Sequence, residues 1–174
     1  MPTSEEKTTV KERDTFPPFP YDPFQAEAVD LIERNYSVVV SAPTGSGKTL
    51  IAEFVMRRCL ERGEGVIYTA PIKALSNQKF REFDGLFPGQ VGILTGDITH
   101  QPNAPLVIMT TEIFHNQILE EKTGFERFTW IIFDEIHYID DAERGTVWEE
   151  SLIFMPPHMH LLALSATIPN REEF

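Results

Sequence analysis

Two short stretches of the sequence hold residues whose types and spacing point to phosphate chemistry. The first is SAPTGSGKT (41–49), where two glycines precede a lysine and a threonine. Gly45 and Gly47 allow tight turns that aim backbone N–H groups at phosphate oxygens. Lys48 is placed to reach the β- and γ-phosphates, and the hydroxyl of Thr49 to bind Mg²⁺. The stretch therefore predicts a phosphate-binding loop.

The flanks of this loop support the prediction. An apolar run typical of a strand precedes it and a helical pattern follows it, which is the context that such a loop requires. Pro43, Thr44 and Ser46 complete the expected nucleotide contacts, while Ala42 stands where the usual motif has its first glycine. The alternative, a glycine-rich turn that contains GKT by chance, is disfavoured by the strand and the helix.

The second stretch is WIIFDEIHYI (130–139), where two acids and a histidine follow a run of large apolar residues. Buried charges cost several kcal/mol each unless a partner compensates them. Asp134 ends the apolar run, where an acid could hold the Mg²⁺ of a nucleotide, and Glu135 could deprotonate the attacking water. A solvated acidic pair at a strand end is the alternative. Spacing alone leaves His137 as either a structural or a functional residue.

Composition bounds the class of protein. The chain has 174 residues, enough for one domain with a sizeable core, and no apolar run long enough to span a membrane. Its net charge of −12 comes entirely from residues 82–174. Charge alone thus argues against a nucleic-acid binder, although net charge says little about a local groove. With Cys59 as the single cysteine, no intramolecular disulfide can form, and a cytoplasmic location is expected.

The apolar patterns predict alternating strands and helices. Residues 1–15 are expected to form a flexible arm, and the rest one domain in which FPPFPYDP (16–23) is extended. Strands are predicted at 37–42, 65–70, 91–95, 106–110, 130–135 and 161–166, and helices at 24–34, 48–62, 74–86, 112–120 and 143–154. Strands apolar on both faces and separated by helices indicate a mainly parallel, doubly wound α/β sheet covered on both sides, with ligands at the carboxyl ends of its strands.

From Phe16 to Phe174 the chain resembles the first RecA-like domain of superfamily 2 DExH-box helicases, and more narrowly the superkiller-like, exosome-associated RNA helicases. The motifs occur in order: FPYDPFQ (19–25), SAPTGSGKT, APIKALSNQK (70–79), LTGD (94–97), MTTEI (109–113), DEIH (134–137), DDAERGTVWEE (140–150) and LSATIPN (164–170). In that family an alanine at position 42 is normal.

The resemblance implies further roles. Gln25 would bond the adenine edge and Phe19 would pack on its face, so that ATP and Mg²⁺ are the expected cofactors. Contacts to single-stranded or tailed nucleic acid, RNA favoured, would come from Pro71, Lys73, Ser76, Gly96, Thr110 and Thr111. Ordinary solvated lysines and strand threonines are the alternative for this set. His137, Ser165 and Thr167 would couple nucleotide state to a second RecA-like domain.

The resemblance also implies an ATP-dependent RNA helicase that unwinds in the 3′–5′ direction. Nothing like motifs IV to VI follows, and an arginine finger contributes about 10³–10⁵ in rate. The 174-residue chain alone is therefore expected to bind nucleotide weakly and to turn it over slowly. A DNA helicase of the same superfamily and a nucleotide-binding scaffold that recruits a nuclease complex stay open as alternatives.

Overall fold

The computed structural model describes residues 16–120, 124–136 and 142–166, with side chains omitted at 142–145. The predicted arm, residues 1–15, lies outside this part of the chain. The helices are α1 (Pro23–Glu33), α2 (Lys48–Glu61), α3 (Lys73–Leu86), α4 (Thr111–Leu119) and α5 (Ala142–Ile153). The strands are β1 (Val38–Ser41), β2 (Gly65–Ala70), β3 (Val91–Leu94), β4 (Thr99–His100), β5 (Leu106–Thr110), β6 (Phe128–Phe133) and β7 (His160–Ser165).

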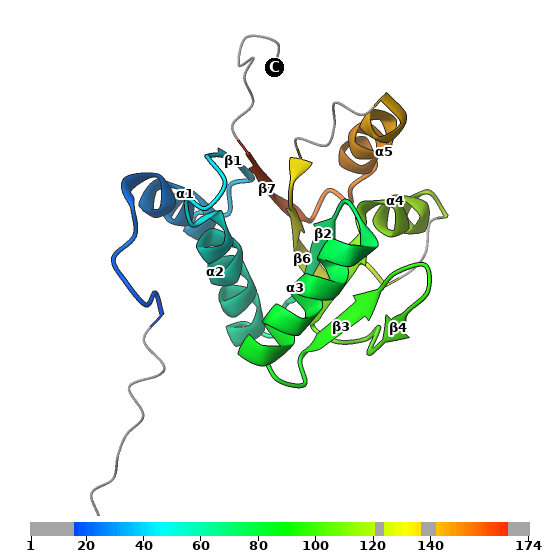
Figure 1. Cartoon of the computed structure of the whole chain (residues 1–174), viewed down its shortest axis with the longest axis horizontal. Coiled ribbons are helices and arrows are strands. Elements are labelled where there is room, and N and C mark those ends of the chain that lie inside the picture. Colours follow the sequence, from blue (N-terminus) through cyan, green and yellow to red (C-terminus); the bar gives the residue numbers. More distant parts are fainter. Residues whose placement is uncertain (1–15, 121–123, 137–141, 167–174) are drawn as a thin grey trace, which may run out of the picture.

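The strands form one sheet in the order β1-β7-β6-β2-β5-β3-β4 (Figure 1). Every neighbouring pair is parallel except β3 and β4. The predicted mainly parallel α/β sheet is confirmed. Because the strands are parallel, the loops that leave their carboxyl ends all emerge at one edge of the sheet, where such folds bind ligands.

Helices cover both faces of the sheet (Figure 1). The first face packs on α1, α2 and α3 around a core that includes Ile32, Val55, Phe83 and Trp130. The second face packs on α4 and α5 around Phe114, Phe133 and Trp148. Since side chains alternate along a strand, residues 130 and 132 of β6 face the first layer and residues 131 and 133 the second.

Two details differ from the prediction. The short strand β4 is not expected from the sequence, since two residues carry no periodic signal. The expectation that strands are covered on both sides is wrong for β1, where Val39 is 65% exposed. β1 lies at the edge of the sheet, and the described helices α4 and α5 pack farther in on that face. No helix in the described ranges has both the length and the apolar content of a membrane span.

Candidate nucleotide-binding site

The predicted phosphate loop and the predicted magnesium acid leave the same edge of the sheet. β7 lies between β1, which leads into the loop, and β6, which ends before Asp134. Ser41 is paired with Ser165, and the N–H of Ala42 donates to the carbonyl of Ser165 over 3.2 Å. The strand order therefore places the two sequence motifs one strand apart, although 86 residues separate Lys48 from Asp134 along the chain.

The loop has the backbone geometry that its glycines allow. Gly45 and Gly47 have φ values of +80° and +87°, which L side chains rarely adopt. Gly47 is the N-cap of α2, so the helix begins at Lys48 directly after the loop. The first turn of a helix leaves N–H groups without intrahelical partners and presents a positive partial charge. This end of α2 therefore suits an anion.

Side chains in the loop also fit a phosphate ligand. The Lys48 ammonium donates to the carbonyls of Ala42 and Pro43 over 2.6 and 2.9 Å, so a cation lies within the loop. The Ser46 hydroxyl is buried and has no hydrogen-bond partner in the described structure. Thr49 is half-buried in the first turn of α2, and Thr44 is exposed. A buried donor without a partner, in the same loop as a lysine, fits a site that a phosphate completes.

The two residues predicted to bind adenine differ in exposure. Gln25 is 5% exposed, and its amide accepts from the N–H of Asp22 (2.8 Å) and donates to the carbonyl of Gly47 (3.0 Å). It therefore joins α1 to the loop, a contact that the sequence did not predict. Phe19 is 68% exposed, so its ring is open to a ligand.

The acidic pair is held by backbone and side-chain bonds. Asp134 is half-buried, and its N–H donates to the carbonyl of Thr69 over 3.0 Å. Glu135 has φ +57°, an uncommon value for a residue with a side chain, and its N–H donates to Asp134 Oδ1 over 3.0 Å. The chain thus turns sharply after Asp134, and both acids stay at the sheet edge.

Tyr68 of β2 belongs to this site although sequence reasoning did not select it. Its hydroxyl donates to Asp134 Oδ2. Burial raises the pKa of the Tyr68 phenol well above its usual range, and the nearby Asp134 carboxylate raises it further. A phenol ring near the carboxyl end of a mostly apolar core strand was the signal in the sequence.

The predicted nucleic-acid residues separate into exposed and buried groups. Lys73 begins α3, is exposed, and pairs with Asp97 at 2.6 Å beside Gly96. Pro71 is half-buried before it. Ser76 is fully buried, and its hydroxyl donates to the carbonyl of Ile72.

The two threonines at the end of β5 are buried as well. Thr110 is the N-cap of α4 and accepts from the N–H of Ile113, while Thr111 donates to the carbonyl of Ala70 over 3.4 Å. In this conformation Lys73 and Gly96 are therefore the accessible members of the predicted set.

Of the predicted coupling residues, Ser165 is described. It is fully buried at the end of β7, and its hydroxyl donates to the carbonyl of Ala166 over 2.7 Å. His137 and Thr167 lie outside the described residues. Ser165 therefore sits between the loop and the acid pair, as the strand order requires.

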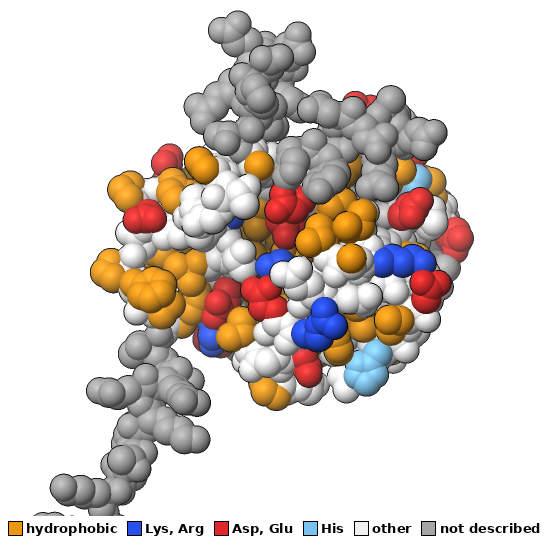
Figure 2. All heavy atoms as spheres, in the orientation of Figure 1, with side chains coloured by type: hydrophobic (Ala, Val, Ile, Leu, Met, Phe, Trp, Pro, Cys, Tyr) orange, Lys and Arg blue, Asp and Glu red, His pale blue; other side chains and the backbone are white. Residues whose placement is uncertain are grey.

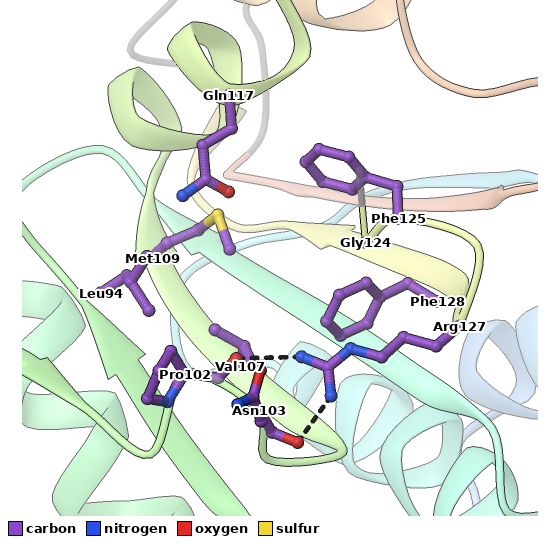
Figure 3. Close-up of a pocket in the computed structure, with 10 residues that line it drawn as sticks. All are labelled: Leu94, Pro102, Asn103, Val107, Met109, Gln117, Gly124, Phe125, Arg127 and Phe128. Carbon is purple, nitrogen blue, oxygen red and sulfur yellow. Dashed lines mark hydrogen bonds between the residues drawn. The ribbon is translucent and has the colours of Figure 1, made fainter. Parts of the chain in front are cut away.

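A cavity of about 200 Å³ lies on the face of the sheet that α4 and α5 cover. Its lining includes Val107, Met109, Gln117, Phe125 and Arg127 (Figure 3). Arg127 closes one side of it by donating to the carbonyls of Pro102, Asn103 and Ala104. Val107 and Met109 face the α4 layer, whereas α2 packs on the opposite layer. The cavity is therefore separate from the phosphate loop.

Charges on the face that carries α2 and α3 are mixed. Figure 2 shows Lys and Arg side chains scattered among Asp and Glu, and the described residues form no continuous basic patch on this side. This agrees with the composition, since the excess of acid begins beyond residue 81.

Comparisons with known proteins agree with this geometry. The model of the family described as DEAD/DEAH box helicase matches residues 22–174. The chain is 48% identical over its full length to "ATP-dependent RNA helicase mtr4" of Schizosaccharomyces pombe, of which it covers 15%. It is 48% identical over 157 residues to "Exosome RNA helicase MTR4" of Homo sapiens, a match that covers 90% of this chain and 15% of that protein. It is 49% identical over 156 residues to "Superkiller complex protein 2" of Mus musculus, a match that covers 90% of this chain and 12% of that protein.

A solved structure shows the same fold. The helicase MrfA bound to DNA aligns with a TM-score of 0.68 at 22% identity, over 85% of this chain and 23% of that one. That identity supports the fold alone. The family model, by contrast, covers the loop, the acid pair and the sheet that joins them. The chain belongs to the DEAD/DEAH box helicase family.

Proposed function

We propose that this chain is the ATP-binding motor domain of an ATP-dependent RNA helicase. The observation that carries the proposal is the convergence of the phosphate loop, the end of β7 and the acids after β6 at one edge of the sheet. Two of the relatives cited above are named as RNA helicases, and the chain spans 15% of the length of each. The activity of the longer protein is therefore part of the proposal.

The residues divide the work at the site. The loop and the first turn of α2 bind the phosphates, and Lys48 neutralises their charge. Thr49 and Asp134 would hold Mg²⁺, and the ion would supply positive charge beside the phosphoryl oxygens. Glu135 accepts a proton from the attacking water. Gln25 and Phe19 bind the adenine, with Gln25 already bonded to the loop at Gly47.

We assign the nucleic-acid contact to the loops beside α3. Lys73 and Gly96 are exposed there, and Lys73 can exchange its bond to Asp97 for a phosphate. RNA is favoured over DNA as the strand, because these two relatives are named as RNA helicases. Ser165 pairs with Ser41 before the loop and precedes the segment that would face a second RecA-like domain. For the two domains together we propose 3′–5′ unwinding. A cytoplasmic or nuclear location accompanies this function.

The proposal is tested first by nucleotide binding. The chain should bind ADP in the presence of Mg²⁺, measured by titration calorimetry, and Lys48→Ala should weaken this binding by at least about 10-fold, because the cation in the loop is lost. Lys79→Ala is a matched control, because Lys79 pairs with Glu82 on α3 and lies outside the site. Equal affinities for Lys48→Ala and the unaltered chain would contradict the proposal.

The second test concerns nucleic acid. In the longer protein to which we assign this domain, ATP hydrolysis should rise with RNA and less with DNA of the same sequence. Stimulation by DNA alone would favour the DNA helicase alternative, and tight nucleotide binding without hydrolysis would favour the scaffold. The 174-residue chain alone should not unwind a duplex.

A further inference from the structure

The buried side chain of Tyr68 contacts Asp134, the acid at the carboxyl end of β6. Tyr68 is 1% exposed and pairs with Ile132 of the neighbouring parallel strand β6. Asp134 lies two residues beyond Ile132, toward the carboxyl edge and on the same face. The phenol ring spans this step, and its hydroxyl donates to Asp134 Oδ2.

The other atoms of Asp134 are also held. Its Oδ1 accepts the N–H of Glu135 at 3.0 Å, and its own N–H donates to the carbonyl of Thr69 at 3.0 Å. The terminal torsion of an aspartate is otherwise broad. Bonds to both oxygens therefore fix the plane of the carboxylate.

Packing fixes the position of the hydroxyl in turn. The Tyr68 ring meets the Phe83 ring of α3 edge-on, with centroids 5.0 Å apart and planes at 71°. Phe83 is fully buried. The phenol can therefore not swing away from Asp134 without moving α3.

We propose that Tyr68 is a positioning residue, whose hydroxyl orients the Asp134 carboxylate to receive Mg²⁺. This inference rests on the proposed function, in which Asp134 holds the metal. Partners that orient metal ligands typically matter by about 10–100-fold in metal affinity. A tyrosine that only satisfies a buried hydroxyl would affect folding stability and leave the metal dependence unchanged.

The test compares nucleotide binding with and without the metal. Tyr68→Phe removes the hydroxyl and keeps the ring against Phe83. We expect the gain in ADP affinity that Mg²⁺ gives, measured by calorimetry against excess EDTA, to fall by about 10-fold or to vanish. Affinity in EDTA should stay as in the unaltered chain, which also reports that the variant is folded. An unchanged magnesium gain overturns the inference.

Tyr36→Phe is the matched control. Tyr36 is 52% exposed between α1 and the amino end of β1, whereas the site lies at the carboxyl ends of the strands, so both affinities should stay unchanged. If the unaltered chain shows no magnesium gain, the proposed function fails, and the inference with it. If the gain is present and Tyr68→Phe retains it, the inference alone fails.

A double-mutant cycle separates a local effect from a general one. In an Asp134→Ala background, Tyr68→Phe should cause no further loss of the magnesium gain, because its effect passes through that carboxylate. Additive losses would overturn the inference. If Tyr68→Phe does not fold, Phe83→Leu gives a second test, because it loosens the packing of the Tyr68 ring. We expect Phe83→Leu to reduce the gain in ADP affinity that Mg²⁺ gives, by less than Tyr68→Phe would. No reduction would count against the proposal.

Discussion

At the residue scale, the side chains of the candidate site depend on neighbours both near and far along the chain: Lys48 bonds within its own loop, whereas Asp134 bonds to Tyr68 of another strand. Lys48 and Asp134 are found from local motifs, since glycines before a lysine and acids after an apolar run are visible within a short window of sequence. Tyr68 is missed because its partner lies 66 residues away, and only the β2–β6 register brings them together. The exposure of Lys73 and the burial of Ser76 could not be read from spacing either.

Cys59 carries a prediction at the same scale. The thiol is fully buried, and burial raises its pKa to about 11. Since the thiolate is the reactive form, iodoacetamide at a pH of about 8 should modify the folded chain very slowly and the urea-unfolded chain readily. Mass spectrometry measures both rates. Equal rates would show that Cys59 is accessible.

The same shift has a consequence for stability. Above the pKa of the unfolded thiol, about 8.5, the unfolded state loses the proton first, so it binds fewer protons than the folded state. The contribution of Cys59 to the free energy of unfolding should therefore fall as pH rises from about 8.5 toward about 11. Denaturant titrations of Cys59→Ala should lack this part of the pH dependence.

At the element scale, short apolar runs predicted the major strands, and helical apolar spacing predicted the helices, with ends within about two residues. What the patterns could not predict was β4 and the exposed face of β1, because both depend on what lies beside a strand rather than on its own residues.

The phosphate loop gives a prediction for this scale. An alanine Cβ at position 47 would lie 2.5 Å from the Gln25 amide and would also force a residue with a side chain to φ +87°. Gly47→Ala should therefore lower both stability and nucleotide affinity, the backbone strain alone costing about 1–2 kcal/mol. Thermal unfolding and calorimetry measure the two effects.

Two other glycines separate the causes. Position 45 has φ +80°, and an added methyl group would meet no atom within 4 Å, so Gly45→Ala should show the backbone cost without the clash. A methyl group at Gly85, inside α3, would also meet open space, and Gly85→Ala should be neutral or stabilise the chain by about 0.5–1 kcal/mol. A Gly47→Ala variant no worse than Gly45→Ala would show that the Gln25 contact yields easily.

At the scale of the whole molecule, nucleotide binding should raise stability. A ligand that binds only the folded state at about 100 times its Kd contributes about 2.7 kcal/mol. For a chain of this size, about 1 kcal/mol shifts Tm by about 2–4 °C, so ADP with Mg²⁺ should raise Tm by roughly 5–10 °C. Differential scanning fluorimetry checks this, and the shift should be absent in Lys48→Ala.

The exposed face of β1, which carries Val39, affects whether the chain self-associates at high concentration. In the described part of the chain β1 pairs on one side only, with β7, and its other side presents unpaired backbone groups next to an apolar side chain. Such edges are templates for strand addition between molecules. Concentrated samples should therefore self-associate through β1, and a lysine at position 39 should keep them monomeric.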